Sequence, residues 1–260
     1  QDDRPAGVPV DTLILHYTGM MSAPRAIAWL ANPASKVSCH YVVDEHGRIT
    51  QMVSEADRAW HAGVGSWHGE TDINSASVGI EIQNPGHDLG YPEFGPAQMA
   101  AVAALSRDII ARNGIPATRV LAHSDVSPGR KIDPGEKLDW PGLNAAGVGH
   151  WISPAPLDEN DYGLGAGDRD ATIARATALL ARYGYGITPC DTLDPAGTKV
   201  VRSFQLHFRP ARPDGRVDRS TLATLEALVA AAEAVALRHL TARVSLSLGS
   251  PSLTAHLPLG

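Results

Sequence analysis

Residues 77–86 read SVGIEIQNPG, and this short stretch decides what kind of fold the chain can have. In an extended segment the side chains alternate between two faces, with Val78, Ile80 and Ile82 on one and Gly79, Glu81 and Gln83 on the other. A period of two with one wholly aliphatic face is typical of a strand that covers a hydrophobic core. The stretch therefore predicts a sheet strand, and it places the carboxylate of Glu81 on the face turned away from that core.

Comparable patterns lie on both sides of this strand. Further strands are predicted within residues 12–18, 39–53 and 119–125, the second of these ranges holding two strands around a turn. Helices are predicted within residues 23–33 and 96–114, where apolar residues recur at helical spacing. Strands mixed with helices in this way predict an α/β protein with a central sheet covered by helices.

The composition changes after residue 140. Residues 141–167 are rich in glycine, proline, asparagine and alanine, as is typical of a linker. Helical patterns follow at residues 168–184, 196–208 and 219–240, so we expect a small C-terminal all-α three-helix bundle.

These changes divide the chain into four predicted segments. They are a first α/β domain at residues 1–145, a linker at 146–165, a helical domain at 166–240, and a tail or ordered extension at 241–260.

Composition limits the classes of protein to which the chain can belong. A hydrophobic content of 43% and a charged content of 19% are ordinary for a globular protein and show no signature of disorder. The net charge of -6 argues against the basic surface of a nucleic-acid binder. We expect no membrane span, because no apolar run approaches about eighteen residues. The start at Gln1 fits a removed signal or lipoprotein leader, and it also fits an arbitrary boundary.

Three residues suggest a metal site. His16 and His123 stand at the ends of predicted strands, and Asp133 follows on a loop rich in proline and glycine. Two imidazoles and a carboxylate are a ligand set of catalytic zinc, with a fourth position left for water. Spacing alone leaves other interpretations open, since histidines after strands are often structural and Asp133 before a proline can simply start a turn.

Glu81 and Lys131 strengthen the metal hypothesis. Glu81 interrupts an apolar strand, where it is either a solvent-facing side chain or a general base aimed at a metal-bound water. Lys131 precedes Asp133 by two residues, where it is either a solvated loop lysine or a partner for the oxyanion of a tetrahedral intermediate.

Five segments resemble a known family. The segments LILHYT, VSCHYVVDEHGRITQMV, RAWHAGVGSW, NSASVGIEIQNPG and AHSDVSPGRKIDPG occur in the order and approximate spacing of the type-2 zinc amidases. These are N-acetylmuramoyl-L-alanine amidases, related to the peptidoglycan recognition proteins. The resemblance spans about residues 10–143. Within this family, the chain is similar to the envelope amidases that carry an extra C-terminal domain. It implies a central mixed β-sheet flanked by helices.

The resemblance also implies roles for particular residues. One zinc ion per chain is expected on His16, His123 and Asp133, with Glu81 and Lys131 as catalytic residues. Trp60, His61 and Ala62 stand where the family lines its substrate cleft, although Trp60 and His61 are equally suited to packing. Asp133 matches the bacterial branch that carries an aspartate there, whereas several relatives carry a cysteine.

The C-terminal segment resembles a three-helix peptidoglycan-binding domain. The resemblance rests on VVRSFQLHFRPARPDGRVDRSTLATLEAL, residues 200–228. Phe204, Val217 and Leu222 in it fit a hydrophobic core, so a bundle kept for stability is the alternative to a glycan-binding module.

The implied function is hydrolysis of the amide between the lactyl group of N-acetylmuramic acid and L-alanine of the stem peptide, in peptidoglycan or muropeptides including anhydro-muropeptides. Two alternatives stay open: a non-hydrolytic peptidoglycan-binding protein on the same fold, and a zinc peptidase that cuts within the stem peptide. The expected partner is the peptidoglycan or muropeptide substrate, with no nucleic acid. We expect a monomer in the cell envelope, periplasmic or outer-membrane associated, and a lipid anchor on a removed N-terminus is compatible with this.

Overall fold

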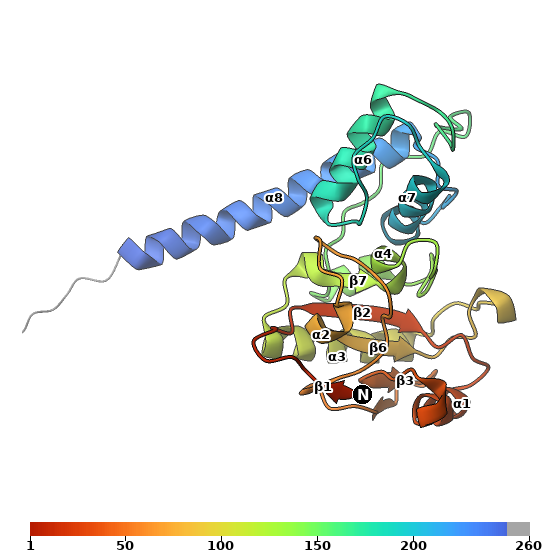
Figure 1. The fold of residues 1–260 in the computed structure, drawn as a ribbon, viewed down its shortest axis with the longest axis vertical. Coiled ribbons are helices and arrows are strands. Elements are labelled where there is room, and N and C mark those ends of the chain that lie inside the picture. The colour runs from red at the N-terminus through yellow and green to blue at the C-terminus, as the bar shows by residue number, and fades with distance from the viewer. Residues whose placement is uncertain (249–260) are drawn as a thin grey trace, which may run out of the picture.

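The computed structural model describes residues 1–248 and consists of an α/β unit and a group of C-terminal helices (Figure 1). The strands are β1 (Asp2–Asp3), β2 (Thr12–Tyr17), β3 (Tyr41–Val43), β4 (Ile49–Gln51), β5 (Asp57–Arg58), β6 (Ser77–Ile82) and β7 (Val120–Ala122). The α-helices are α1 (Ala23–Leu30), α2 (Ile73–Ala76), α3 (Pro96–Asn113), α4 (His123–Val126), α5 (Trp140–Ala145), α6 (Ala171–Tyr183), α7 (Pro195–Phe208) and α8 (Arg219–Leu248). Short 3-10 helices lie at η1 (Pro33–Ser35), η2 (His87–Leu89) and η3 (Ala117–Arg119).

The central sheet has five strands in the order β4-β3-β6-β2-β7. Strand β2 pairs in parallel with β6 and β7, and β3 in parallel with β6, whereas β4 is antiparallel to β3. The predicted α/β class with a central mixed sheet is therefore confirmed. Strand β6 lies in the middle of the sheet, and its register with β2 places Glu81 beside His16.

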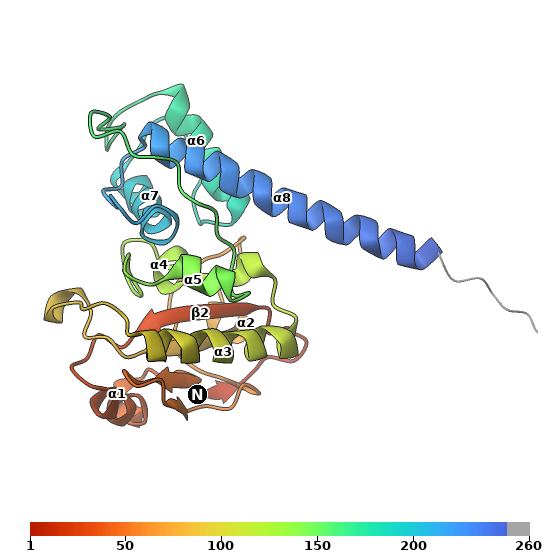
Figure 2. The ribbon, with the colours of Figure 1, turned by 180° about the vertical axis from the view of Figure 1, so that it is seen from behind.

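Helix α3 covers one face of this sheet, as Figure 2 shows. It begins at Pro96, a residue suited to the first turn because the missing N–H would have no partner there. It ends at Gly114, whose φ of 68° is the left-handed conformation that glycine favours. The core between α3 and the sheet includes Leu13, Leu15, Val78, Ile80, Ile82, Val102, Leu105 and Ile109. The aliphatic face of β6 thus lies under α3, as its alternation predicted.

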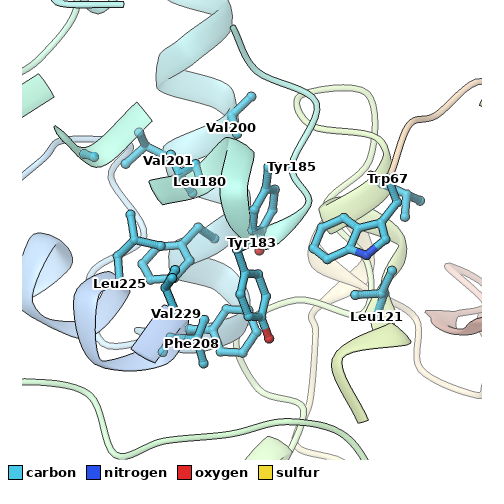
Figure 3. Packing of buried hydrophobic residues seen from close by; sticks show 14 of the residues in the cluster. Trp67, Leu121, Leu180, Tyr183, Tyr185, Val200, Val201, Phe208, Leu225 and Val229 are labelled. Carbon is cyan, nitrogen blue, oxygen red and sulfur yellow. The ribbon is translucent and has the colours of Figure 1, made fainter. Parts of the chain in front are cut away.

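The C-terminal helices (the helical unit, α6 to α8) pack against the α/β unit beyond strand β7, next to α4 and α5 (Figures 1 and 2). Trp67 and Leu121 of the α/β unit share a buried cluster with Tyr183, Tyr185 and Phe208 of the helical unit (Figure 3). The rings of Trp67 and Tyr185 meet edge to face, with 5.0 Å between their centroids. The two units therefore share one continuous hydrophobic cluster.

The segments predicted between and after the units differ in detail from the structure. Residues 141–145 of the linker-like stretch 141–167 belong to helix α5, which Asp139 caps by accepting a hydrogen bond from the N–H of Gly142 at 2.9 Å, whereas the predicted linker segment 146–165 begins just after this helix. Helix α8 was predicted to end at residue 240 and continues to Leu248. The predicted tail at 241–260 therefore begins inside a helix, and its residues 249–260 lie outside the described residues. The four domain boundaries stay predictions.

Helix α8 bears on the expectation of no membrane span, which stays a prediction. By length and composition alone, Arg219–Arg238 passes the test for a helix that could cross a membrane, with a hydropathy of 1.5 in its most apolar window. Core helices of soluble proteins pass the same test, and Leu225, Leu228 and Val229 are buried in the helical unit. The helix then projects away from both units (Figures 1 and 2).

Candidate metal centre and cleft

The candidate site lies on the sheet face opposite α3. Along β2, Leu13 and Leu15 point into the core under α3, so His16 points to the other face. Glu81 is on that same face of β6, next to His16 in the parallel register. Strand alternation alone thus brings an imidazole and a carboxylate together.

His123 and Asp133 reach this place from the segment that follows β7. His123 is the first residue of α4, and the N–H of the next residue donates to the Asp133 carbonyl at 3.0 Å. At Gly135 the φ is +79°, and a Cβ there would lie 2.3 Å from the Tyr91 hydroxyl oxygen. That hydroxyl donates to the Pro134 carbonyl at 2.8 Å. The loop around Asp133 is therefore fixed by contacts that only glycine permits.

The three predicted metal ligands converge. Nδ1 of His16 lies 2.9 Å from Nδ1 of His123, and Oδ2 of Asp133 lies 3.1 and 3.0 Å from these two nitrogens. All three side chains are buried, and within residues 1–238, whose side chains the structure describes, they are the only group of His, Cys or acidic atoms placed to hold a metal ion.

The position of the proton on His16 follows from a chain of hydrogen bonds behind it. The Ser77 hydroxyl donates to the Ile73 carbonyl at 2.6 Å, so it accepts from Nε2–H of His61 at 3.2 Å. Nδ1 of His61 then accepts from Nε2–H of His16 at 3.0 Å. Neutral His16 is left with its free lone pair on Nδ1, which faces Asp133.

His123 is oriented in the same sense by a different partner. Its Nε2–H donates to the Ala62 carbonyl at 2.9 Å, and because a carbonyl can only accept, the lone pair of the neutral ring is on Nδ1. Lone pairs of His16, His123 and Asp133 therefore face one another in a buried space, which is unfavourable without a cation between them. Two imidazole nitrogens and a carboxylate oxygen fit a divalent metal such as zinc.

The electrostatics of these groups keep them ready to bind a metal. Burial, and after it the neighbouring His123, lower the pKa of His16 from 6.5 to about 4 against the opposing effect of Asp133, so His16 is neutral at pH 7. Burial alone would raise the pKa of Asp133, but its interactions with His123 and His16 outweigh this and hold the pKa well below the usual range. A neutral imidazole and an ionised carboxylate are the forms that bind metals.

Glu81 has a different environment from Asp133. Burial raises the pKa of its carboxyl well above the usual value, the Asp133 charge raises it further, and the Lys131 charge opposes the increase. Its Oε2 is buried and has no hydrogen-bond partner. An unpaired carboxyl oxygen beside the ligand cluster is available to a water molecule or a substrate proton.

Glu81 and Lys131 open onto one cleft. The cleft has a volume of about 270 Å³ and is also lined by the three candidate ligands. The structure thus brings all five predicted metal and catalytic residues to one place.

The three predicted substrate-binding residues differ in whether their side chains reach the cleft. Trp60 and His61 line the cleft, and the indole N–H of Trp60 donates to Asp2 at 2.7 Å. His61 is mostly buried and supports His16 from behind, so its main contact is with a candidate ligand. Ala62 is fully buried and contributes its carbonyl to His123 rather than a side chain to the cleft.

Two residues of the site were not anticipated from the sequence. Trp29 of α1 lines the cleft and is 48% exposed, and a large aromatic residue on the exposed side of a short helix was the available signal. Arg130 donates to the carbonyls of Ala62 at 2.5 Å and Val64 at 2.6 Å, which ties the loop before Asp133 to the loop at residues 62–64. Nothing local in the sequence distinguishes Arg130 from a solvated loop arginine.

A mixed sheet with two histidines and an aspartate around one point, and a buried glutamate beside them, defines an α/β protein with a candidate single-metal hydrolytic centre. The family model for N-acetylmuramoyl-L-alanine amidases matches residues 6–136, and a model for a peptidoglycan binding domain matches residues 169–225. The chain therefore belongs to the N-acetylmuramoyl-L-alanine amidase family, as the sequence motifs predicted.

Individual relatives resemble the chain over half of its length or more. AmiD of Escherichia coli (strain K12) is 37% identical over 233 residues, which cover 85% of this chain and 82% of that protein. A structure of E. coli AmiD with the substrate anhydro-N-acetylmuramic acid-L-Ala-D-γ-Glu-L-Lys covers 88% of this chain and 92% of its own, with a TM-score of 0.72 and 36% identity. AmpDh3 from Pseudomonas aeruginosa covers 88% of this chain and 94% of its own, with a TM-score of 0.71 and 30% identity. The 1,6-anhydro-N-acetylmuramyl-L-alanine amidase AmpD of Haemophilus influenzae (strain ATCC 51907 / DSM 11121 / KW20 / Rd) is 39% identical over 157 residues, which cover 54% of this chain and 83% of that protein.

Proposed function

We propose that this protein is a zinc-dependent amidase that hydrolyses the bond between the lactyl group of N-acetylmuramic acid and L-alanine, in peptidoglycan and in muropeptides that include anhydro-muropeptides. The observation that carries the proposal is the convergence of three lone pairs, from His16, His123 and Asp133, beside the unpaired carboxyl of Glu81. The substrate class is supported by the family and by the anhydro-muramoyl tripeptide with which E. coli AmiD was solved.

The residues present would hold one zinc ion on His16, His123 and Asp133. Zinc held by three protein ligands supplies Lewis-acid activation of water and of a carbonyl group. Glu81 takes the proton of the attacking water and delivers it to the nitrogen of L-alanine as the amide bond breaks. Desolvation makes the ionised carboxylate of Glu81 a strong base, and a divalent charge beside it favours that ionised form.

Lys131 is assigned to the oxygen of the scissile carbonyl. Its side chain lines the cleft together with Glu81, and its positive charge suits the negative charge that develops on that oxygen. Trp60 and Trp29, which both line this cleft, offer aromatic surface for the sugar or the lactyl group. His61 is assigned to the support of His16, and the fully buried side chain of Ala62 is assigned no contact with the substrate.

The helical unit is assigned to the peptidoglycan polymer. Its match to a peptidoglycan binding domain supports this assignment. A bound polymer raises the local concentration of cleavable bonds at the cleft. The cell envelope is the proposed location, since the polymeric substrate lies there, and a monomer is the proposed state.

The test combines metal content with product analysis. Purified protein is assayed for zinc, and release of the free stem peptide from a muropeptide is followed before chelation, after chelation and after zinc is restored. Glu81→Gln removes the base and keeps the shape, and Glu159→Gln, on the exposed surface, is the matched control. We expect one zinc per chain, activity that the chelator abolishes, and loss of activity in Glu81→Gln alone.

Other outcomes point to the alternative functions. Zinc without peptide release, together with retention on sacculi, would identify a non-hydrolytic binding protein. Cleavage inside the stem peptide would identify a peptidase. Protein that binds no zinc would refute the metal centre.

A further inference from the structure

Asp125 is a fully buried carboxylate that the proposed mechanism does not use. It stands in α4, two residues after His123, and its Oδ2 accepts from the backbone N–H of Ala122 at 2.8 Å. Its other two hydrogen bonds come from the helical unit. The Tyr185 hydroxyl donates to Oδ1 at 2.7 Å, and Nδ1 of His207 donates to Oδ2 at 2.6 Å.

Both donors are held in place by packing. Trp140 of α5 stacks on His207, with 3.6 Å between ring centroids and 22° between planes. Trp67 packs edge to face against Tyr185. Tyr185 is 3% and His207 1% exposed, so neither side chain is free to turn towards solvent. The geometry around the carboxylate is therefore set by residues from both units.

Helix α4 connects this carboxylate to the metal ligands. His123 is the first residue of α4, and the N–H of Ser124 donates to the Asp133 carbonyl at 3.0 Å. The helical unit touches the same loop again where the stem of Lys199 crosses Gly129, at which a Cβ would lie 2.2 Å from the lysine Cδ. The ligand-bearing loop is thus restrained from the α7 side at two separate points.

We propose that Tyr185 and His207 are positioning residues of the metal centre, which act through Asp125. By holding Asp125 they fix α4 and thereby the ligands His123 and Asp133. Two of the three hydrogen bonds of a fully buried carboxylate come from the helical unit, and a buried carboxylate left without donors is strongly destabilising. The helical unit is then part of the catalytic apparatus as well as a contact to the polymer. The inference rests on the metal site of the proposed function.

This role differs measurably from tethering. Asp125, Tyr185 and His207 do not line the cleft, so they act on a substrate there only through the residues they position. Tethering raises the rate on a polymer and leaves a small soluble substrate unaffected. Positioning acts on both. A soluble anhydro-N-acetylmuramoyl tripeptide therefore separates the two roles.

The decisive variant is Tyr185→Phe in the full chain, because it removes one donor and keeps the ring. Tyr183→Phe is its matched control, since Tyr183 is equally buried in the same cluster but its hydroxyl pairs with Nδ1 of His150 at 2.8 Å. Zinc affinity is measured by competition with a coloured chelator, and kcat and KM on the soluble tripeptide substrate. We expect Tyr185→Phe to weaken zinc binding roughly tenfold to a hundredfold and to lower kcat with little change in KM, and Tyr183→Phe to change neither by more than about twofold.

A second pair of variants tests the His207 contact. Asparagine can place a donor near the position of Nδ1, whereas leucine removes the donor and keeps the bulk. Amide hydrogen exchange at residues 123–135 of the metal-free protein is the readout. We expect faster exchange in His207→Leu and Tyr185→Phe, and near wild-type exchange in His207→Asn. If thermal unfolding shows that His207→Leu does not fold, Tyr185→Phe decides alone.

Failure of this inference is distinguishable from failure of the proposed function. Folded Tyr185→Phe with the zinc affinity and exchange of the wild type overturns the positioning role, whatever the substrate is. A wild-type protein that binds zinc but releases no stem peptide overturns the amidase instead and leaves the zinc comparison intact. A wild-type protein that binds no zinc refutes the metal site, and faster exchange at residues 123–135 in Tyr185→Phe then still supports the contact between the units.

Discussion

The two faces of the central sheet differ in what their side chains do: one packs a hydrophobic core and the other carries the candidate metal site. The face under α3 is hydrophobic on every strand that contributes to it, and its residues pack into a core. The opposite face carries His16 and Glu81 and is covered by loops and by the helical unit. Because side chains alternate along a strand, sequence neighbours point to opposite faces. Leu15 and Ile80 belong to the core under α3, whereas the residues that follow them, His16 and Glu81, belong to the candidate metal site. A substitution should therefore damage stability on one face and metal binding on the other.

The largest expected effect on the site face comes from Asp133→Ala. The variant removes the only carboxylate among the three candidate ligands. The two Nδ1 atoms of His16 and His123 then lose the anion beside them. We expect zinc affinity to fall by more than about a hundredfold, beyond the effect of losing an outer partner, and peptide release to become undetectable. Chelator competition and product analysis measure both. Retention of one tightly bound zinc by the folded variant would contradict the assignment.

A smaller effect is expected from Ser77→Ala, which breaks the hydrogen-bond chain behind His16 without touching a ligand. The loss leaves Nε2–H of His61 without its acceptor, so the tautomer of His61 and the orientation of His16 are no longer fixed. We expect a tenfold to hundredfold loss of zinc affinity, roughly the effect of losing an outer hydrogen-bond partner of a ligand.

Ser106→Ala is the control for this experiment. Ser106 is a fully buried serine of α3, on the apolar side, and its hydroxyl has no hydrogen-bond partner. The control should bind zinc as the wild type does. Equal zinc affinity in all three proteins would mean that the chain behind His16 has no part in the metal site.

Much of this arrangement was predictable because it depends on local patterns. The period of two in residues 77–86 placed Glu81 opposite the aliphatic residues, and strand ends placed His16 and His123 at one edge. The glycines and prolines around Asp133 indicated a fixed loop. These signals need only the neighbours of a residue along the chain, and the family motifs added the roles.

The contacts that support the ligands were not predictable in this way. His61 supports His16 across 45 residues, and the partners of Asp125 lie 60 and 82 residues further along the chain. No local period encodes such a pairing. The contact of Ala62 with His123 was not predictable for a related reason. It is made by a backbone carbonyl, which every residue type has, so the identity of the residue gives no signal of it.

Gly79 and Ile80 offer a direct comparison of the two faces on one strand. A Cβ at Gly79 would lie 2.5 Å from the His61 ring, so Gly79→Ala should cost about 1–3 kcal/mol of stability as overpacking and should also weaken zinc binding. Ile80→Val removes one methylene from the core under α3 and should cost about 0.5–1.5 kcal/mol with unchanged zinc affinity. Urea unfolding and chelator competition test both variants. A wild-type zinc affinity in Gly79→Ala would break the proposed division between the faces.

A dependence of stability on pH also belongs to the site face. His40 is fully buried, and its Nδ1 accepts from the N–H of Gly79 at 3.0 Å. Burial lowers its pKa from 6.5 to about 4, the Arg4 charge acts in the same direction, and a hydrogen bond to the Asp57 carbonyl and the Glu55 charge oppose the change. Between these two values the unfolded chain binds a proton on His40 and the native protein does not, so stability is lost as the pH falls.

His40→Asn isolates this contribution, because an amide oxygen can accept from Gly79 without titrating. We expect the wild type to lose up to about 1.4 kcal/mol per pH unit relative to the variant, from about pH 6.5 down to about pH 4. The measurement is urea unfolding of both proteins in the same buffers at several pH values across that range. Differences common to both proteins, including those from His16 and Asp133, cancel in the comparison. Parallel stability curves would show that His40 binds protons equally in the native and the unfolded chain. They would overturn the prediction that this residue makes the site face sensitive to acid.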